Sequence, residues 1–188
     1  LSKALEYFED ETKLFEELYR SFPDNVSLKH GLAISYEKLG TTHSSLGNLN
    51  KALEYFEDEA TLMQVLYHSY PDNVSLKNGL AISYEKLGST HSSLDNLSKA
   101  LKYFEERNRL SEELYRSYPD TVSLKNGLAI SYWKLGDFYR EKQKDSQHAR
   151  HYFQLAEQQW SELVELAPDY ARFKQYLERV KSDLADLA

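Results

Sequence analysis

Apolar residues recur three and four positions apart along the chain, which is the spacing of one face of an α-helix. Charged and polar residues fill the positions between them. The pattern breaks at four prolines: Pro23, Pro71, Pro119 and Pro168. Because proline does not continue a helix interior, these breaks separate helices. The pattern predicts an all-α protein with no strand.

Each of the three long segments between prolines also contains a turn, the first at Gly47-Asn48, and together these breaks predict eight helices. They are expected at about residues 1–21, 26–46, 48–69, 74–94, 97–117, 122–142, 146–166 and 170–187. An aspartate follows each proline, and we expect Asp24 and Asp72 to cap the helices that begin there. The segments 25–27 and 73–75 match the Asn-x-Ser glycosylation pattern, and we interpret them as helix starts.

A long block of sequence recurs along the chain. Residues 1–48 and 49–96 agree at 37 of 48 positions, and Tyr-x-Lys-Leu-Gly begins at Tyr36, Tyr84 and Tyr132. A repeat of this length is typical of solenoids and arrays, in which each unit contacts its neighbours. We predict one array over residues 1–188, built from a lone second helix, three helix pairs and a capping helix. Their expected bounds are 1–21, 24–69, 72–117, 120–166 and 169–188.

Glycine lies inside helices at equivalent positions of this repeat. Gly40, Gly88 and Gly136 each follow the Lys-Leu pair. A glycine in a helix interior costs roughly 1 kcal/mol relative to alanine, so a packing reason is expected. We predict that a neighbouring helix approaches closely there.

The repeat resembles the tetratricopeptide repeat family. Tyr36, Leu39 and Gly40 precede Ala52 and Phe56, as the aromatic, Leu-Gly, Ala and Phe positions of that family's signature do. The same spacing recurs in the second copy of the repeat, and again in the third copy with one insertion. The resemblance implies a right-handed α-solenoid of antiparallel helix pairs.

This repeat is longer than the family's usual unit of about 34 residues. About seven extra residues fall in each helix, which is nearly two turns, so the apolar face keeps its direction. The helices are therefore expected to have about 20 residues, or roughly 30 Å. Two positions of the repeat depart from the family pattern in residue type. His43 and His91 replace a tyrosine at one position, and Glu59 replaces a small residue at the other.

Composition narrows the possible partners. The net charge is −7, which disfavours nucleic acid, and no apolar run is long enough to span a membrane. The chain has no cysteine, so it has no thiolate site or disulfide. We expect a cytoplasmic protein without a cofactor. The first residue is leucine, so the chain is expected to be a fragment of a longer protein.

Candidate catalytic and metal-binding groups each have a simpler explanation. The acidic cluster Glu54, Glu57, Asp58 and Glu59 recurs in the first unit, and we interpret it as a solvated helix face. The pair at 148 and 151 has two histidines on one helical face but no third ligand. We interpret the histidines at 43 and 91 as core residues. No nucleophile elbow or phosphate loop is present, so no enzyme is predicted.

The resemblance also implies a binding surface. In this family the first helix of each pair lines the concave side, where extended peptides lie. Ile34, Ile82 and Ile130 are expected to form an apolar line there, flanked by Asn78 and Asn126, whose amides suit a peptide backbone. The full predicted peptide-binding set is His30, Ile34, Glu37, Thr41, Asn78, Ile82, Glu85, Ser89, Asn126, Ile130, Trp133, Asp137 and Arg140.

One binding mode is disfavoured, and two alternatives stay open from the residues alone. Glu37 and Glu85 disfavour the carboxylate clamp that some arrays of this family use. Trp133 is either an interface anchor or a filler near the last helix pair. The leading function is a non-catalytic protein-interaction module that binds a peptide or protein segment; the rival is a structural spacer within a larger signalling protein.

The first helix is expected to leave an apolar patch uncovered. Leu1, Leu5, Phe8 and Phe15 share one face, and no earlier helix precedes them. Contiguous apolar patches mark association sites. We therefore predict self-association through the N-terminal helix or further units upstream.

Overall fold

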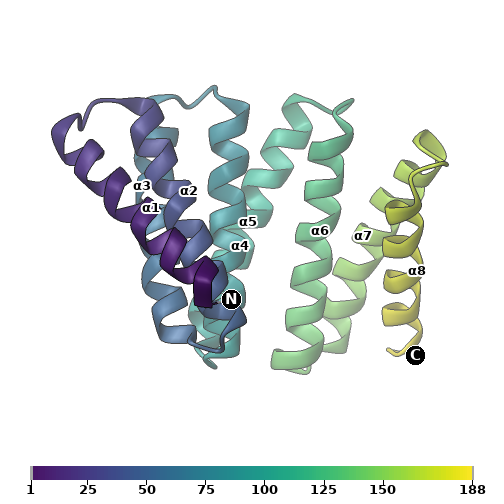
Figure 1. The fold of residues 1–188 in the computed structure, drawn as a ribbon. Coiled ribbons are helices and arrows are strands. Elements are labelled where there is room, and N and C mark those ends of the chain that lie inside the picture. The colour runs from purple at the N-terminus through teal and green to yellow at the C-terminus, as the bar shows by residue number, and fades with distance from the viewer. Residues whose placement is uncertain (1, 188) are drawn as a thin grey trace. The chain divides into compact units, whose positions relative to one another are not determined.

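The computed structural model describes residues 2–187 (Figure 1). Within that range all regular structure is helical, and no strand is present. The elements are α1 (Ser2–Ser21), α2 (Val26–Ser45), α3 (Leu49–Ser69), α4 (Val74–Ser93), α5 (Leu97–Ser117), α6 (Val122–Phe138), the π-helical turn η1 (Tyr139–Gln143), α7 (Ser146–Leu166) and α8 (Ala171–Ala185). The predicted all-α fold and helix positions are confirmed.

The helix starts correct one prediction. Asn25 caps α2, because its side-chain Oδ1 accepts a hydrogen bond from the Leu28 N–H at 3.1 Å. Asn73 caps α4 in the same way. The expected caps Asp24 and Asp72 lie one residue too early for this bond. The two Asn-x-Ser segments are helix starts, as predicted.

The first helix of each pair is followed by a residue of positive φ at the same repeat position. Gly47 has φ of 78°, Asp95 of 56° and Lys144 of 55°. This left-handed conformation turns the chain into the second helix of each pair. Only the first copy uses glycine there, which adopts it without strain.

The single insertion of the third copy is absorbed in η1. The helix from Val122 was expected to continue regularly to Lys142, but it changes to a π-helical turn at Tyr139. A π turn bonds five residues back, so it accommodates one extra residue without rotating the flanking helix faces. The starts of α5 and α7, at Leu97 and Ser146, are therefore one position further apart than the starts of α3 and α5.

The chain divides into two compact units, residues 1–100 and 101–188. In the first unit, α1, α2, α3 and α4 pack in chain order as antiparallel neighbours. In the second, α7 lies between α6 and α8. A single continuous array over the whole chain stays a prediction.

Close helix approach at the repeat glycines is confirmed in both units. A Cβ atom on Gly40 would lie 2.5 Å from the Cε1 atom of Phe56, and a Cβ on Gly136 would lie 2.5 Å from Cδ1 of Phe153. Both phenylalanine rings are buried. The second helix of each of these pairs therefore rests its aromatic ring directly on the glycine backbone.

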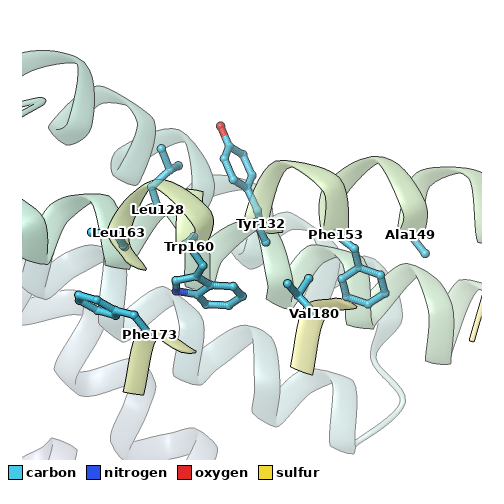
Figure 2. Close-up of a cluster of buried hydrophobic side chains, with 10 residues drawn as sticks. Leu128, Tyr132, Ala149, Phe153, Trp160, Leu163, Phe173 and Val180 are labelled. Carbon is cyan, nitrogen blue, oxygen red and sulfur yellow. The ribbon is translucent and has the colours of Figure 1, made fainter. Parts of the chain in front are cut away.

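The core of the second unit is built around Trp160 (Figure 2). Its ring lies 5.1 Å from that of Tyr176 on α8, and Phe153 and Val180 are fully buried in the same cluster. Figure 2 shows the Tyr132 ring at the edge of this cluster with its hydroxyl pointing away. Aromatic and aliphatic side chains from three helices thus join α6, α7 and α8.

The two histidines are core residues, as predicted. His43 and His91 are buried, and the His43 ring stacks on Tyr55 at 5.5 Å. Burial lowers the pKa of both imidazoles, so both are held neutral.

The uncovered face of α1 differs from the predicted one. Leu1 lies outside the described residues, and Leu5 and Phe8 are half-buried; Phe15 packs against Gly31 of α2. The exposed apolar residues are instead Tyr7 (68 % exposed) and Leu14 (57 %). In the next copy the residue equivalent to Tyr7 is covered, because Tyr55 stacks on His43 of α2.

Candidate functional site

A pocket of about 120 Å³ lies among α2, α3 and α4 in the first unit. We call it the unit 1 pocket. Its lining residues are His30, Ala33, Ile34, Glu37, Glu59, Met63, Gly79 and Ile82. Four of the predicted peptide-binding residues are among them, and the structure brings those four together.

The helical period explains why residues of α2 line the pocket together. His30, Ile34 and Glu37 lie four and three residues apart on one face of α2, and Ile82 faces them from α4. Ile34 is 38 % exposed and Ile82 41 %, so two large apolar side chains meet solvent at the pocket. Such exposure at a concave site is typical of a binding surface.

Met63 and Gly79 form the contact between α3 and α4 beneath the pocket. Met63 is buried, and a Cβ on Gly79 would lie 2.5 Å from its methyl carbon. The glycine therefore leaves room for the thioether. Neither residue was identified from the sequence.

Three charged groups meet at one end of the pocket. Lys86 Nζ lies 2.6 Å from Oε1 of Glu37 and 3.5 Å from Oε1 of Glu59. Glu59 is 4 % exposed, whereas the other three residues of its acidic cluster are exposed. The prediction that all four belong to a solvated face is wrong for Glu59.

The environment changes the acidity of Glu59. Burial raises its pKa to about 7; the nearby Glu37 adds to this, and Lys86 opposes it. The sequence contained an indication that Glu59 is buried, because this residue occupies a position at which the family pattern has a small, packed side chain.

The remaining predicted residues of α2 and α4 do not line the pocket. Thr41 is exposed one turn beyond Glu37, and Asn78, Glu85 and Ser89 are half-buried. Their role in peptide binding stays a prediction.

In the second unit the predicted residues contact their own chain. The Trp133 indole N–H donates to Asp183 of α8 at 2.7 Å, and Arg140 donates to the other oxygen of that carboxylate at 2.7 Å. Arg140 also donates to Asp137 at 2.8 Å. These bonds hold the Trp133 indole against α8, and its role as an interface anchor stays a prediction.

Two more predicted residues of this unit pack internally. Asn126 accepts a hydrogen bond at 3.1 Å from the indole N–H of Trp160, which is buried. Ile130 is half-buried against the core cluster. The sequence did not reveal this Asn–Trp bond, because its partners lie 34 residues apart on different helices.

The comparisons with known proteins agree with this architecture. The tetratricopeptide repeat model matches residues 33–58 and 81–112, each of which joins a first helix to the second helix of the same pair. These segments are tetratricopeptide repeats. The resemblance inferred from the signature residues is confirmed, and the family supports a protein-interaction role in general terms. No curated protein matches the chain.

The chain is similar to several solved structures. One is the yeast histone chaperone Hif1, which is described as a scaffold protein recruiting protein complexes to core histones. It is 11 % identical to this chain, the match covers 99 % of this chain and 96 % of that chain, and the TM-score is 0.59. A tetratricopeptide repeat protein of Thermus thermophilus is 16 % identical, with coverage of 97 % and 93 % and a TM-score of 0.43. MamA is 20 % identical, with coverage of 96 % and 81 % and a TM-score of 0.43.

Two larger hollows occupy equivalent places in the two units. One, of about 390 Å³, includes Glu16 and Tyr36; the other, of about 410 Å³, includes Glu112 and Tyr132. In the first the tyrosine hydroxyl donates to the glutamate at 3.0 Å, and in the second it does so at 3.1 Å. Because the same hollow recurs with the repeat, we interpret it as a consequence of tetratricopeptide packing.

The part of the chain that the structure describes offers no group of three side chains able to hold a metal ion. His148 bonds Asp145 at 2.7 Å at the start of α7. Over the same residues, none of the helices is both long enough and apolar enough to cross a membrane.

Proposed function

We propose that the chain is a non-catalytic protein-interaction module that holds an extended protein segment along α2 and α4 of its first unit. The observation that carries the proposal is the unit 1 pocket, where Ile34 and Ile82 remain exposed on facing helices. Burying such side chains against a partner supplies favourable free energy, roughly 1.5–3 kcal/mol for one that becomes fully buried.

The pocket is too small for a typical small-molecule site of about 300–1,000 Å³. Its volume of about 120 Å³ suits one amino-acid side chain, as in the recognition of extended peptides. The half-buried amide of Asn78, one residue before Gly79, supplies both a donor and an acceptor for a peptide backbone near the pocket.

A library of random peptides of about 12 residues, displayed on phage and selected against the chain, tests this proposal. The selected peptides are measured by isothermal titration calorimetry. We expect Ile82→Ser and Ile34→Ser each to weaken binding about five- to tenfold, since each removes about 1 kcal/mol of apolar burial.

Val65→Ser is the matched control. Val65 is 43 % exposed on α3, similar to Ile82, but it does not line the pocket. Equal losses of peptide affinity in Val65→Ser and Ile82→Ser would contradict binding in the groove. Selected peptides whose affinity is unchanged in both isoleucine variants would contradict it as well. The spacer alternative would then be favoured, because a spacer needs no affinity for a peptide.

A further inference from the structure

The charged end of the unit 1 pocket has two carboxylates for one ammonium group. Lys86 Nζ is 2.6 Å from Glu37 and 3.5 Å from Glu59. The Oε2 atom of Glu59 is buried and accepts no hydrogen bond within the described chain. A buried carboxylate oxygen without a donor is costly, so a further donor would be stabilising here.

The preceding repeat shows the satisfied form of the same pair. Glu11 and Lys38 occupy the repeat positions of Glu59 and Lys86 one copy earlier. Lys38 Nζ bonds both oxygens of Glu11, each at 2.9 Å. In the pocket, Lys86 Nζ lies closer to Glu37 than to Glu59, and it contacts one oxygen of Glu59 at the longer distance of 3.5 Å.

The shape of the pocket complements this charge. Ile34 and Ile82 present exposed apolar surface, and the buried Met63 lies between α3 and α4. A long basic side chain has an aliphatic stem for such surface and a cationic tip for carboxylates. The net charge of −7 also attracts basic segments over a distance.

We propose that the unit 1 pocket receives a lysine or arginine side chain of the bound protein segment, with its stem between Ile34 and Ile82 and its cation on Glu37 and Glu59. The proposal rests on the proposed function and adds the chemistry of the partner. It makes Glu59 a specificity-determining residue of the groove.

Binding of a cation changes the protonation of the pocket. The charged and titratable groups around Glu59 are Glu37 and His30 of α2 and Lys86 of α4. Since burial raises the pKa of Glu59 to about 7, part of this carboxyl is protonated at neutral pH. A bound cation favours the ionised form, so binding releases protons and tightens as the pH rises through about 7.

Met63 offers a direct reporter, because it is the single methionine of the chain. Labelling with methyl-¹³C methionine therefore yields one NMR signal, located at the pocket. The probes are the N-acetyl, N-methylamide derivatives of lysine, arginine, norleucine and glutamate. Norleucine has a similar unbranched aliphatic stem without a charge.

We expect the lysine or arginine derivative to shift the Met63 signal in a saturable manner. Norleucine should bind about tenfold more weakly, because a charge-assisted hydrogen bond is worth roughly that factor. Norleucine binding as tightly as both basic probes, or no saturable shift with any probe, overturns the proposal.

Glu59→Gln is expected to remove the preference for the basic probes, and Glu11→Gln, its repeat equivalent outside the pocket, is expected to keep it. Should Glu59→Gln impair folding, Glu37→Gln serves as the second variant and is expected to weaken the same preference. Selected peptides that depend on Ile82 but lack basic residues would refute the cation pocket and leave the groove standing.

Discussion

Replacing Gly136 by alanine measures the cost of separating α6 from α7. The new Cβ would lie 2.5 Å from Cδ1 and 2.7 Å from Cε1 of Phe153. That ring is fully buried in the core cluster, so moving it displaces packed neighbours. Overpacking of this kind costs about 1–3 kcal/mol, whereas the helix propensity of alanine returns about 1 kcal/mol. Combining these two opposing effects, we expect a net loss of about 0–2 kcal/mol.

Gly127 supplies a matched control in the same helix. It lies in the interior of α6, and a Cβ there meets nothing within 4 Å among the described residues. Gly127→Ala should therefore stabilise the protein by about 1 kcal/mol through helix propensity alone. The free energies of unfolding of the two variants are expected to differ by about 1–3 kcal/mol, with Gly136→Ala the less stable.

Urea unfolding followed by tryptophan fluorescence is the assay. The two tryptophans, at 133 and 160, both lie in the second unit, so the signal reports the region that contains both glycines. With a slope of about 1–3 kcal/mol per molar urea, the midpoints should separate by about 1 M. A Gly136→Ala variant as stable as Gly127→Ala would refute close packing at Gly136. Gly136→Leu should lose still more stability, because a leucine adds volume at the same contact.

The other predictions concern single side chains. Asn126→Ala should cost about 1–3 kcal/mol in urea unfolding, because it leaves the buried indole N–H of Trp160 without its acceptor; an unchanged midpoint would contradict this. The raised pKa of Glu59, about 7 against 4.5, favours the protonated form in the folded state. The contribution of the protonated carboxyl to the free energy of unfolding is full below pH 4.5 and is lost as the pH rises through 7. Glu59→Gln should therefore be more stable than the wild type at pH 8, by up to roughly 3 kcal/mol, and about as stable as the wild type at pH 4. If the N-terminal helix self-associates, Tyr7→Ser with Leu14→Ser should lower the sedimentation coefficient at high concentration, and a wild type that sediments as a monomer would refute that association.

The sequence by itself determined the helices and their register. Helical periodicity, the four prolines and the long repeat are local or near-identical signals, so they position each element without knowledge of its neighbours. Gly40 and Gly136, inside the helices that precede α3 and α7, also predicted close packing, because a helix interior rarely contains glycine without a packing contact. The positions of His43 and His91 on the apolar face predicted their burial.

Only the tertiary structure decided which polar groups meet. Glu59 has the local pattern of an exposed acidic face, but α4 covers it and brings Lys86 of the following helix to its carboxylate. Trp133 likewise donates a hydrogen bond to Asp183, 50 residues away in the sequence, because helix packing brings the two side chains together. Such pairs depend on the distance and rotation between packed helices, and a one-dimensional pattern of apolar positions does not contain those two quantities.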